Sequence, residues 1–120
     1  MSNSIKDFTD LETWWEAQRL LLEIYKTTED FPKDELFGLV SQIRRASVSV
    51  TSNIAEGFSR YSLAEKTRFY NIAYSSVVEV YNQLIAAKDL GYIKKECFEQ
   101  NILIIISVKK LINGLIKSLC

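Results

Sequence analysis

The fold is decided by residues 41–58, which read SQIRRASVSVTSNIAEGF. In and beside this stretch, two sets of residues recur at spacings of three and four. The polar set is Gln42, Arg45, Ser49, Ser52 and Glu56, and the apolar set is Leu39, Ile43, Ala46, Val50, Asn53 and Gly57. Because residues three and four apart share one face of an α-helix, the pattern predicts a helix with a polar stripe beside an apolar one. The spacing specifies a helix but names no reaction.

Only one proline and four glycines interrupt the 120-residue chain. Pro32 suits the first turn of a helix, where the N–H that proline lacks would have no helical partner. Ser62 and Glu65 are spaced as a capping box, and Gly91 is suited to end a helix. We therefore predict a single domain, residues 1–120, with helices at about 10–28, 33–58, 62–90 and 95–119.

The connections between the expected helices are short, so neighbouring helices are expected to run in opposite directions. Hydrophobic residues make up 48% of the chain, enough to bury the core of one domain without disulfides or metal. The sequence therefore predicts an all-α fold, an antiparallel up-down-up-down four-helix bundle.

Few side chains suited to catalysis are available. Histidine is absent, which excludes Ser-His-Asp and Cys-His arrangements and the Glu-x-x-His sites of di-iron bundles. The chain has no glycine-rich phosphate-binding motif, and Cys97 and Cys120 lack metal-ligand spacing. Glu56 and Glu79 would form an acid and base pair if the helices brought them together, but an ion pair with Arg45 or a capping role is favoured for Glu56. We expect no catalytic residue, metal site, cofactor or enzymatic activity.

Fifteen Lys and Arg residues balance fifteen Asp and Glu residues, so the charge of the whole molecule does not steer it toward nucleic acid. Any phosphate would have to meet a local patch. The candidates are Arg44, Arg45, Arg60 and Arg68, since a guanidinium group binds phosphate through two hydrogen bonds. The alternative is that these charges lie on solvated helix faces or in intramolecular pairs. Asn53 is interpreted as a buried amide that is hydrogen-bonded across a helix interface.

The first residues, the cysteines and the apolar runs of the chain bear on its compartment. It opens MSNSIKDF, without an apolar signal region, and it has no paired cysteine framework. The longest uninterrupted apolar run, Ile102 to Ile106, is far shorter than the roughly 20 residues that cross a bilayer. We expect a cytoplasmic protein that does not enter a membrane.

The apolar surface exceeds what one bundle interior requires. The third expected helix carries one stripe of Phe69, Ala73, Ser76, Val80, Leu84 and Ala87. A second stripe, about 100° around the helix, consists of Tyr70, Tyr74, Val77, Tyr81 and Ile85. Adjacent tryptophans and a fully apolar stretch of the fourth helix likewise cannot face one interior, which predicts a homo-oligomer. The candidate interface residues are Trp14, Trp15, Tyr70, Tyr74, Tyr81 and Ile104. The alternative is that a wide bundle covers them, or that the tyrosines lie half-exposed with their hydroxyls in water.

Residues 42–57, QIRRASVSVTSNIAEG, closely resemble the signature of the 23S rRNA intervening-sequence protein family, which are bacterial four-helix-bundle proteins. The likeness extends to Trp14 and Ala17, to the sequence FGL at 37–39 and to AKDLGYI at 87–93. Two positions depart from the family pattern, because Thr51 stands where proline is common and Trp15 stands where glutamine is common.

The resemblance implies a cytoplasmic, ring-like homopentamer without enzymatic activity, in which Asn53, Glu56 and Gly57 belong to the structural signature. Members are named for reading frames inside insertions in ribosomal RNA genes. Relatives include the accessory variability determinant, the partner of a reverse transcriptase in diversity-generating retroelements. We therefore expect an RNA-binding accessory whose partners are its own copies and either structured RNA or a nucleic-acid-processing protein. The alternative is a protein–protein scaffold that does not bind nucleic acid.

Overall fold

A computed structural model describes residues 4–120, and all regular structure within that range is helical. The main helices are α1 (Glu12–Thr28), α2 (Leu39–Ser59), α3 (Leu63–Asp89) and α4 (Lys95–Lys117), and two short 3-10 turns, η1 (Phe8–Asp10) and η2 (Lys33–Glu35), precede α1 and α2. The all-α prediction with four helices is confirmed.

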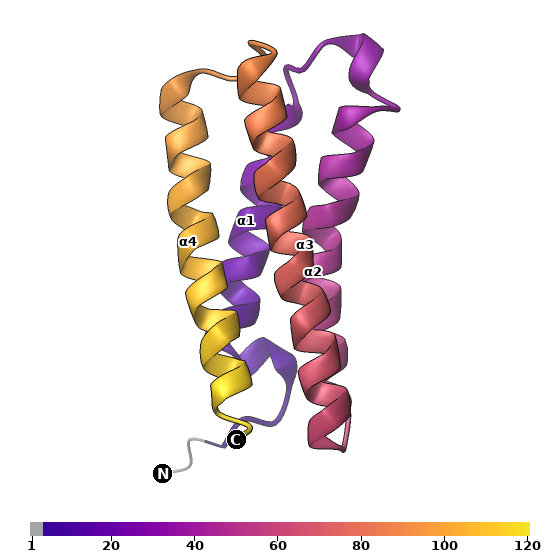
Figure 1. Cartoon of the computed structure of the whole chain (residues 1–120), viewed down its shortest axis with the longest axis vertical. Coiled ribbons are helices and arrows are strands. Elements are labelled where there is room, and N and C mark those ends of the chain that lie inside the picture. Colours follow the sequence, from indigo (N-terminus) through magenta and orange to yellow (C-terminus); the bar gives the residue numbers. More distant parts are fainter. Residues whose placement is uncertain (1–3) are drawn as a thin grey trace.

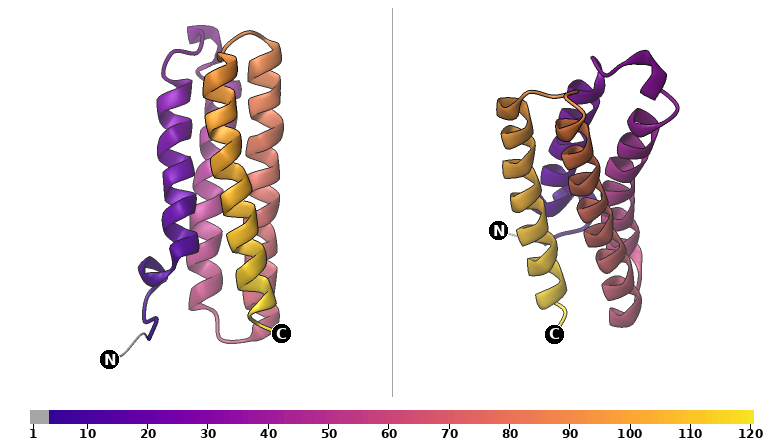
Figure 2. Two further views of the ribbon diagram at one scale, coloured as in Figure 1. Left: turned by 90° about the vertical axis from the view of Figure 1, so that its left-hand side faces the viewer. Right: turned by 45° about the horizontal axis from the view of Figure 1, so that its top comes forward.

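The molecule measures 47 × 26 × 20 Å. Its four helices lie side by side along the longest axis (Figures 1 and 2). Each helix packs against two others: α1 and α3 each contact both α2 and α4, and the α2–α3 contact is the most extensive. The α1–α2 and α3–α4 connections lie at one end and the α2–α3 connection at the other (Figure 1). Within residues 4–120, no helix is both long enough and apolar enough to cross a bilayer.

The core is built from aliphatic side chains of all four helices. Its largest fully buried members are Leu20, Ile24, Ile43, Val50, Ile54, Val77, Val80, Leu84, Ile105, Val108 and Ile112. On α2, Ile43, Ala46, Val50 and Gly57 of the apolar set are buried as the spacing predicts, and Leu39 and Asn53 are half-buried. Gln42, Arg45 and Glu56 of the polar set are exposed. The two stripes therefore divide α2 into a core face and a solvent face.

The second helix begins at Leu39 instead of the expected position near residue 33. The Glu35 carboxylate holds the intervening turn, since its Oε1 accepts the N–H of Leu39 at 3.1 Å and its Oε2 accepts the hydroxyl of Tyr92 at 2.8 Å. The Tyr92 ring also packs on Phe31, with ring centroids 5.4 Å apart. Because Tyr92 is 57 residues from Glu35, local spacing could not reveal this anchor.

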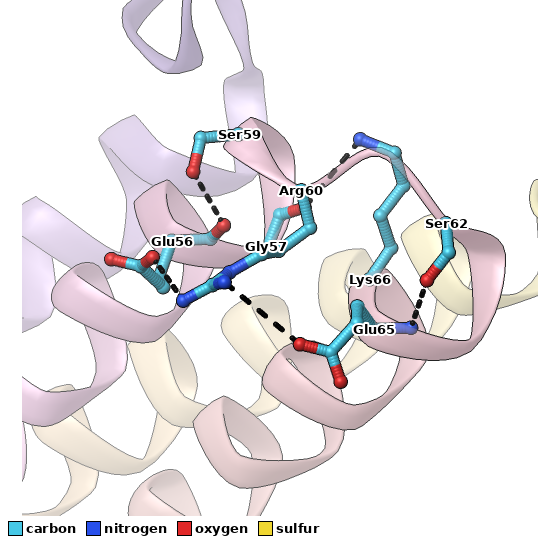
Figure 3. Close-up of polar contacts among 7 residues, drawn as sticks. All are labelled: Glu56, Gly57, Ser59, Arg60, Ser62, Glu65 and Lys66. Atoms are coloured by element: carbon cyan, nitrogen blue, oxygen red, sulfur yellow. Dashed lines mark hydrogen bonds and ion pairs between the residues drawn. The ribbon is translucent and has the colours of Figure 1, made fainter.

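The α2–α3 turn follows the sequence signals more closely. Ser62 Oγ accepts the N–H of Glu65 at 3.1 Å, as expected of a helix cap (Figure 3). The Glu65 carboxylate, expected to complete the capping box, lies 3.9 Å from the guanidinium of Arg60. At the far end of α3, Gly91 has a φ of 81°, a conformation that glycine adopts without strain.

Candidate nucleic-acid interface

The four candidate arginines occupy two separate regions of the α2–α3 pair. Arg44 and Arg45 lie in the first half of α2, Arg60 follows its last residue, and Arg68 lies near the start of α3. The separation of Arg44 and Arg60 along α2 is about 24 Å at a rise of about 1.5 Å per residue. The arrangement does not bring the four side chains into one cluster.

Arg44 is engaged by the C-terminal end of α1. Its Nε donates to Thr28 Oγ1 at 2.9 Å and its Nη2 donates to the carbonyl of Tyr25 at 3.3 Å. The guanidinium also lies 4.5 Å from the centroid of the Tyr25 ring. A cation near the last carbonyls of a helix is favoured by the helix dipole. Arg44 therefore ties α2 to α1.

Arg60 is engaged at the α2–α3 corner (Figure 3). Its Nη2 lies 2.7 Å from Glu56 Oε2, and its Nη1 lies 3.9 Å from Glu65 Oε1. The guanidinium sits 4.7 Å from the centroid of the Phe69 ring, and Arg68 contacts the same ring at 5.1 Å. Because these ionic groups are partly exposed, the ion pairs contribute little stability, and their main effect is to fix side-chain positions.

The signature residues Glu56 and Gly57 build this corner. The partner of Glu56 is Arg60, one turn away, and is neither Arg45 nor Glu79. Glu79 instead accepts a hydrogen bond from Gln83 at 3.4 Å, so the two carboxylates do not form a pair. Gly57 is buried, and a Cβ built there would lie 2.7 Å from the ring of Tyr70. These positions therefore serve the packing of α2 on α3.

Asn53 differs from its expected role. Its amide nitrogen donates to the carbonyl and hydroxyl oxygens of Ser49 at 2.8 and 3.0 Å, both within α2. The bond that crosses to α3 joins Ser49 Oγ to Ser76 Oγ at 2.8 Å. The expected contact between helices is therefore indirect, with Ser49 as its intermediary.

Arg45 is the arginine that the fold leaves free. It is exposed and makes no hydrogen bond, ion pair or ring contact with any residue in 4–120. It lines an open groove of about 480 Å³ between α2 and α3, whose other lining residues are Phe37, Ser41, Gln42, Ala46, Ser49 and Glu79. The sequence pattern indicated Arg45 but not its proximity to Phe37 and Glu79, because the pairing of α2 with α3 creates the groove.

The candidate oligomer residues fall into two groups. Tyr70 and Ile104 are buried in the chain's own core, at 3% and 5% exposure, so their predicted place on an outer surface is wrong. On α3 the core takes residues from both apolar stripes, because Val80 and Leu84 of the first are buried together with Tyr70 and Val77 of the second. Trp14 and Tyr74 are half-buried, whereas Trp15 and Tyr81 are exposed.

A further group of exposed apolar residues lies on α3 and α4, and only one of them, Tyr81, was among the interface candidates predicted from the sequence. Its members are Val78 and Tyr81 on α3 and Leu103 and Ile106 on α4, and we call them the α3–α4 apolar face. In each helix the two residues are three positions apart and so share a side. The signal was present in the run Ile102 to Ile106, of which only Ile104 and Ile105 are buried.

The fold places this protein in the class of small, all-α, four-helix proteins, and residues 4–120 contain no grouping of acidic and cysteine side chains able to hold a metal ion. The model of the 23S rRNA-intervening sequence protein family matches residues 9–114. The protein therefore belongs to that family, which confirms the resemblance seen in its sequence.

A solved structure agrees with this assignment. The chain is similar to a protein of unknown function from the S23 ribosomal protein family of Bacteroides thetaiotaomicron VPI-5482, with a TM-score of 0.78 and 24% sequence identity. The match covers 88% of this chain and 98% of the other. At this level of identity, the likeness shows the fold alone. No curated protein matches the sequence.

Proposed function

We propose that this protein is a cytoplasmic, non-enzymatic homo-oligomer that binds structured RNA. In this proposal, its antiparallel four-helix bundles assemble through apolar outer faces into a ring, which the family resemblance implies to be a pentamer. Copies of Arg45 provide the contacts with RNA.

The α3–α4 apolar face supports the assembly. Its four members are between 37% and 68% exposed, and they lie on adjacent helices. Exposed apolar residues grouped on neighbouring helices are suited to an interface, because their exposure to water is unfavourable. A second copy of the chain is the partner that the family resemblance implies.

The uncommitted charge of Arg45 is the observation that carries RNA binding. A surface arginine without an intramolecular partner is free to form paired hydrogen bonds with a phosphate. In a closed ring, one such arginine from each subunit would produce a repeated basic feature even though the net charge of the chain is zero. The description of the family as 23S rRNA-intervening sequence proteins favours RNA as the polyanion.

A protein scaffold is the second candidate function. Arg44 and Arg60 are engaged within the chain, and Arg68 lies on the ring of Phe69, which reduces the basic surface available to RNA. The nearly complete exposure of Phe37 and Tyr61 would suit contact with another protein.

Titration with structured ribosomal RNA fragments, at low and at physiological salt, separates the two candidates when the subunit stoichiometry is measured in parallel. Binding that is submicromolar and weakens steeply with salt is expected of the RNA accessory. A stable oligomer that binds no RNA at either salt would refute RNA binding and leave the scaffold.

A further inference from the structure

The groove between α2 and α3 offers opposite charges on its two walls. Arg45 comes from α2, Glu79 comes from α3, and the two side chains form no ion pair. A bare phosphate would meet Arg45 favourably but would be repelled by Glu79. The complementary ligand therefore presents an anion at one end and hydrogen-bond donors at the other.

Glu79 is suited to the donor end of such a ligand. An ionised carboxylate only accepts hydrogen bonds, and here Oε2 receives a single weak one from Gln83 at 3.4 Å. Guanine is the RNA base whose Watson–Crick edge carries two adjacent donors, N1–H and the N2 amino group. Adenine and cytosine each place one donor beside an acceptor, so they match a carboxylate less well. A carboxylate in this groove therefore favours guanine.

Phe37 supplies an aromatic surface beside these polar groups. It lies in the turn before α2, lines the groove, and is 92% exposed. Unpaired RNA bases commonly stack on aromatic side chains, because every base has a π-face. Ser41, Gln42 and Ser49 add further hydrogen-bonding groups. The volume of about 480 Å³ falls in the range typical of small-ligand sites.

We propose that this groove binds an unpaired guanosine of RNA. The base stacks on Phe37, its Watson–Crick edge donates to the Glu79 carboxylate, and an adjacent phosphate pairs with Arg45. The inference rests on the proposed RNA-binding function and adds to it a base preference and a requirement for single-stranded nucleotides. In structured RNA, such nucleotides occur in loops and bulges.

The test is fluorescence anisotropy with labelled, single-stranded RNAs of five nucleotides, in which one guanosine, adenosine or cytidine is flanked by uridines. The intact protein should bind the RNA that contains guanosine about tenfold more tightly than the other two RNAs, the discrimination expected of one paired contact with a base edge. Glu79→Gln should reduce this preference to about threefold or less, since the amide replaces one acceptor with a donor.

Phe37→Ala should weaken the binding of all three five-nucleotide RNAs about tenfold, because stacking is lost, without changing the base preference. Glu99→Gln provides the matched control, because Glu99 is exposed on α4 and does not line the groove. All of these side chains are exposed or at the rim of the groove, so circular dichroism and subunit number should remain unchanged in each variant.

The outcomes distinguish this inference from the function on which it rests. Binding to structured RNA fragments without guanosine preference, or with no effect of Glu79→Gln and Phe37→Ala, would overturn the groove proposal and leave RNA binding intact. Guanosine-selective binding of the five-nucleotide RNAs, without affinity for structured fragments, would support the guanosine site in the groove and refute the binding of structured RNA. Absence of binding to either probe would refute both.

Discussion

The ring of Tyr70 occupies the space where a side chain at Gly57 would lie. A Cβ built on Gly57 would be 2.7 Å from Tyr70 Cε1 and 3.1 Å from the Cβ of Phe69. Tyr70 is 3% exposed, and this burial raises the pKa of its hydroxyl. The absence of a side chain at position 57 therefore allows the last turn of α2 to approach α3 closely, beside the connection that contains Arg60.

Gly57→Ala should destabilise the protein by about 1–3 kcal/mol, because the buried Tyr70 ring has to move to admit the methyl group. Urea unfolding would measure this change. Gly114→Ala is the matched control: it also lies in a helix, but its added Cβ meets nothing within 4 Å. The control should gain up to about 1 kcal/mol from improved helix propensity. Equal stability changes in the two variants would contradict the close-packing account.

The hydrogen bond between Tyr92 and Glu35 should make stability depend on pH at both extremes. The bond from Tyr92, with help from the N–H of Leu39, lowers the pKa of Glu35, and the same bond raises the pKa of Tyr92. Stability from Glu35 is present above its unfolded pKa of roughly 4.3 and is lost as the pH falls through the lower folded value. Stability from Tyr92 is present below roughly pH 10 and is lost as the pH rises through the raised folded value.

Tyr92→Phe should therefore flatten both limbs of the stability profile. Urea midpoints measured across the pH range would test this, with Tyr61→Phe as the control, because Tyr61 is fully exposed. A profile unchanged by Tyr92→Phe, or changed equally by Tyr61→Phe, would show that the Tyr92–Glu35 bond does not control these limbs.

The α3–α4 apolar face should control assembly without controlling folding. Replacing both Leu103 and Ile106 with Lys introduces charges that would have to be desolvated in an apolar interface. We expect light scattering to show dissociation to smaller species, while circular dichroism stays helical. Gln100→Lys adds a charge at another exposed position of α4 and should leave the assembly intact. An unchanged subunit number in the double variant would place the interface elsewhere.

The helix pattern of this protein could be predicted from its sequence because residues such as Ile43 and Val50 repeat at helical spacing and do face the core. The start of α2 could not, since it depends on Tyr92, which is distant in sequence. The burial of Tyr70 could not be predicted either, because both stripes of α3 are apolar and the neighbouring helices cover Tyr70 and Val77 of the second stripe but leave Tyr81 exposed.

The candidate site could likewise be predicted from the sequence only in part. Composition and spacing identified the arginines, but only packing shows that Arg44 contacts α1 and that Arg60 contacts Glu56, leaving Arg45 free. The groove around Arg45 was likewise hidden, because six of its lining residues lie between positions 37 and 49, and only the packing of α3 on α2 brings Glu79 beside them.

The most direct test of the proposed function is the salt dependence of RNA binding by the intact oligomer and by its Arg45→Ala variant. We expect Arg45→Ala to weaken binding at physiological salt and to reduce the slope of log K against log salt by about 0.7–0.9 for each arginine engaged, with subunit number unchanged. Arg19→Ala removes the same charge from α1, where Arg19 pairs with Glu16, and should have little effect. Binding that is unaffected by Arg45→Ala, or equally weakened by both variants, would contradict the account.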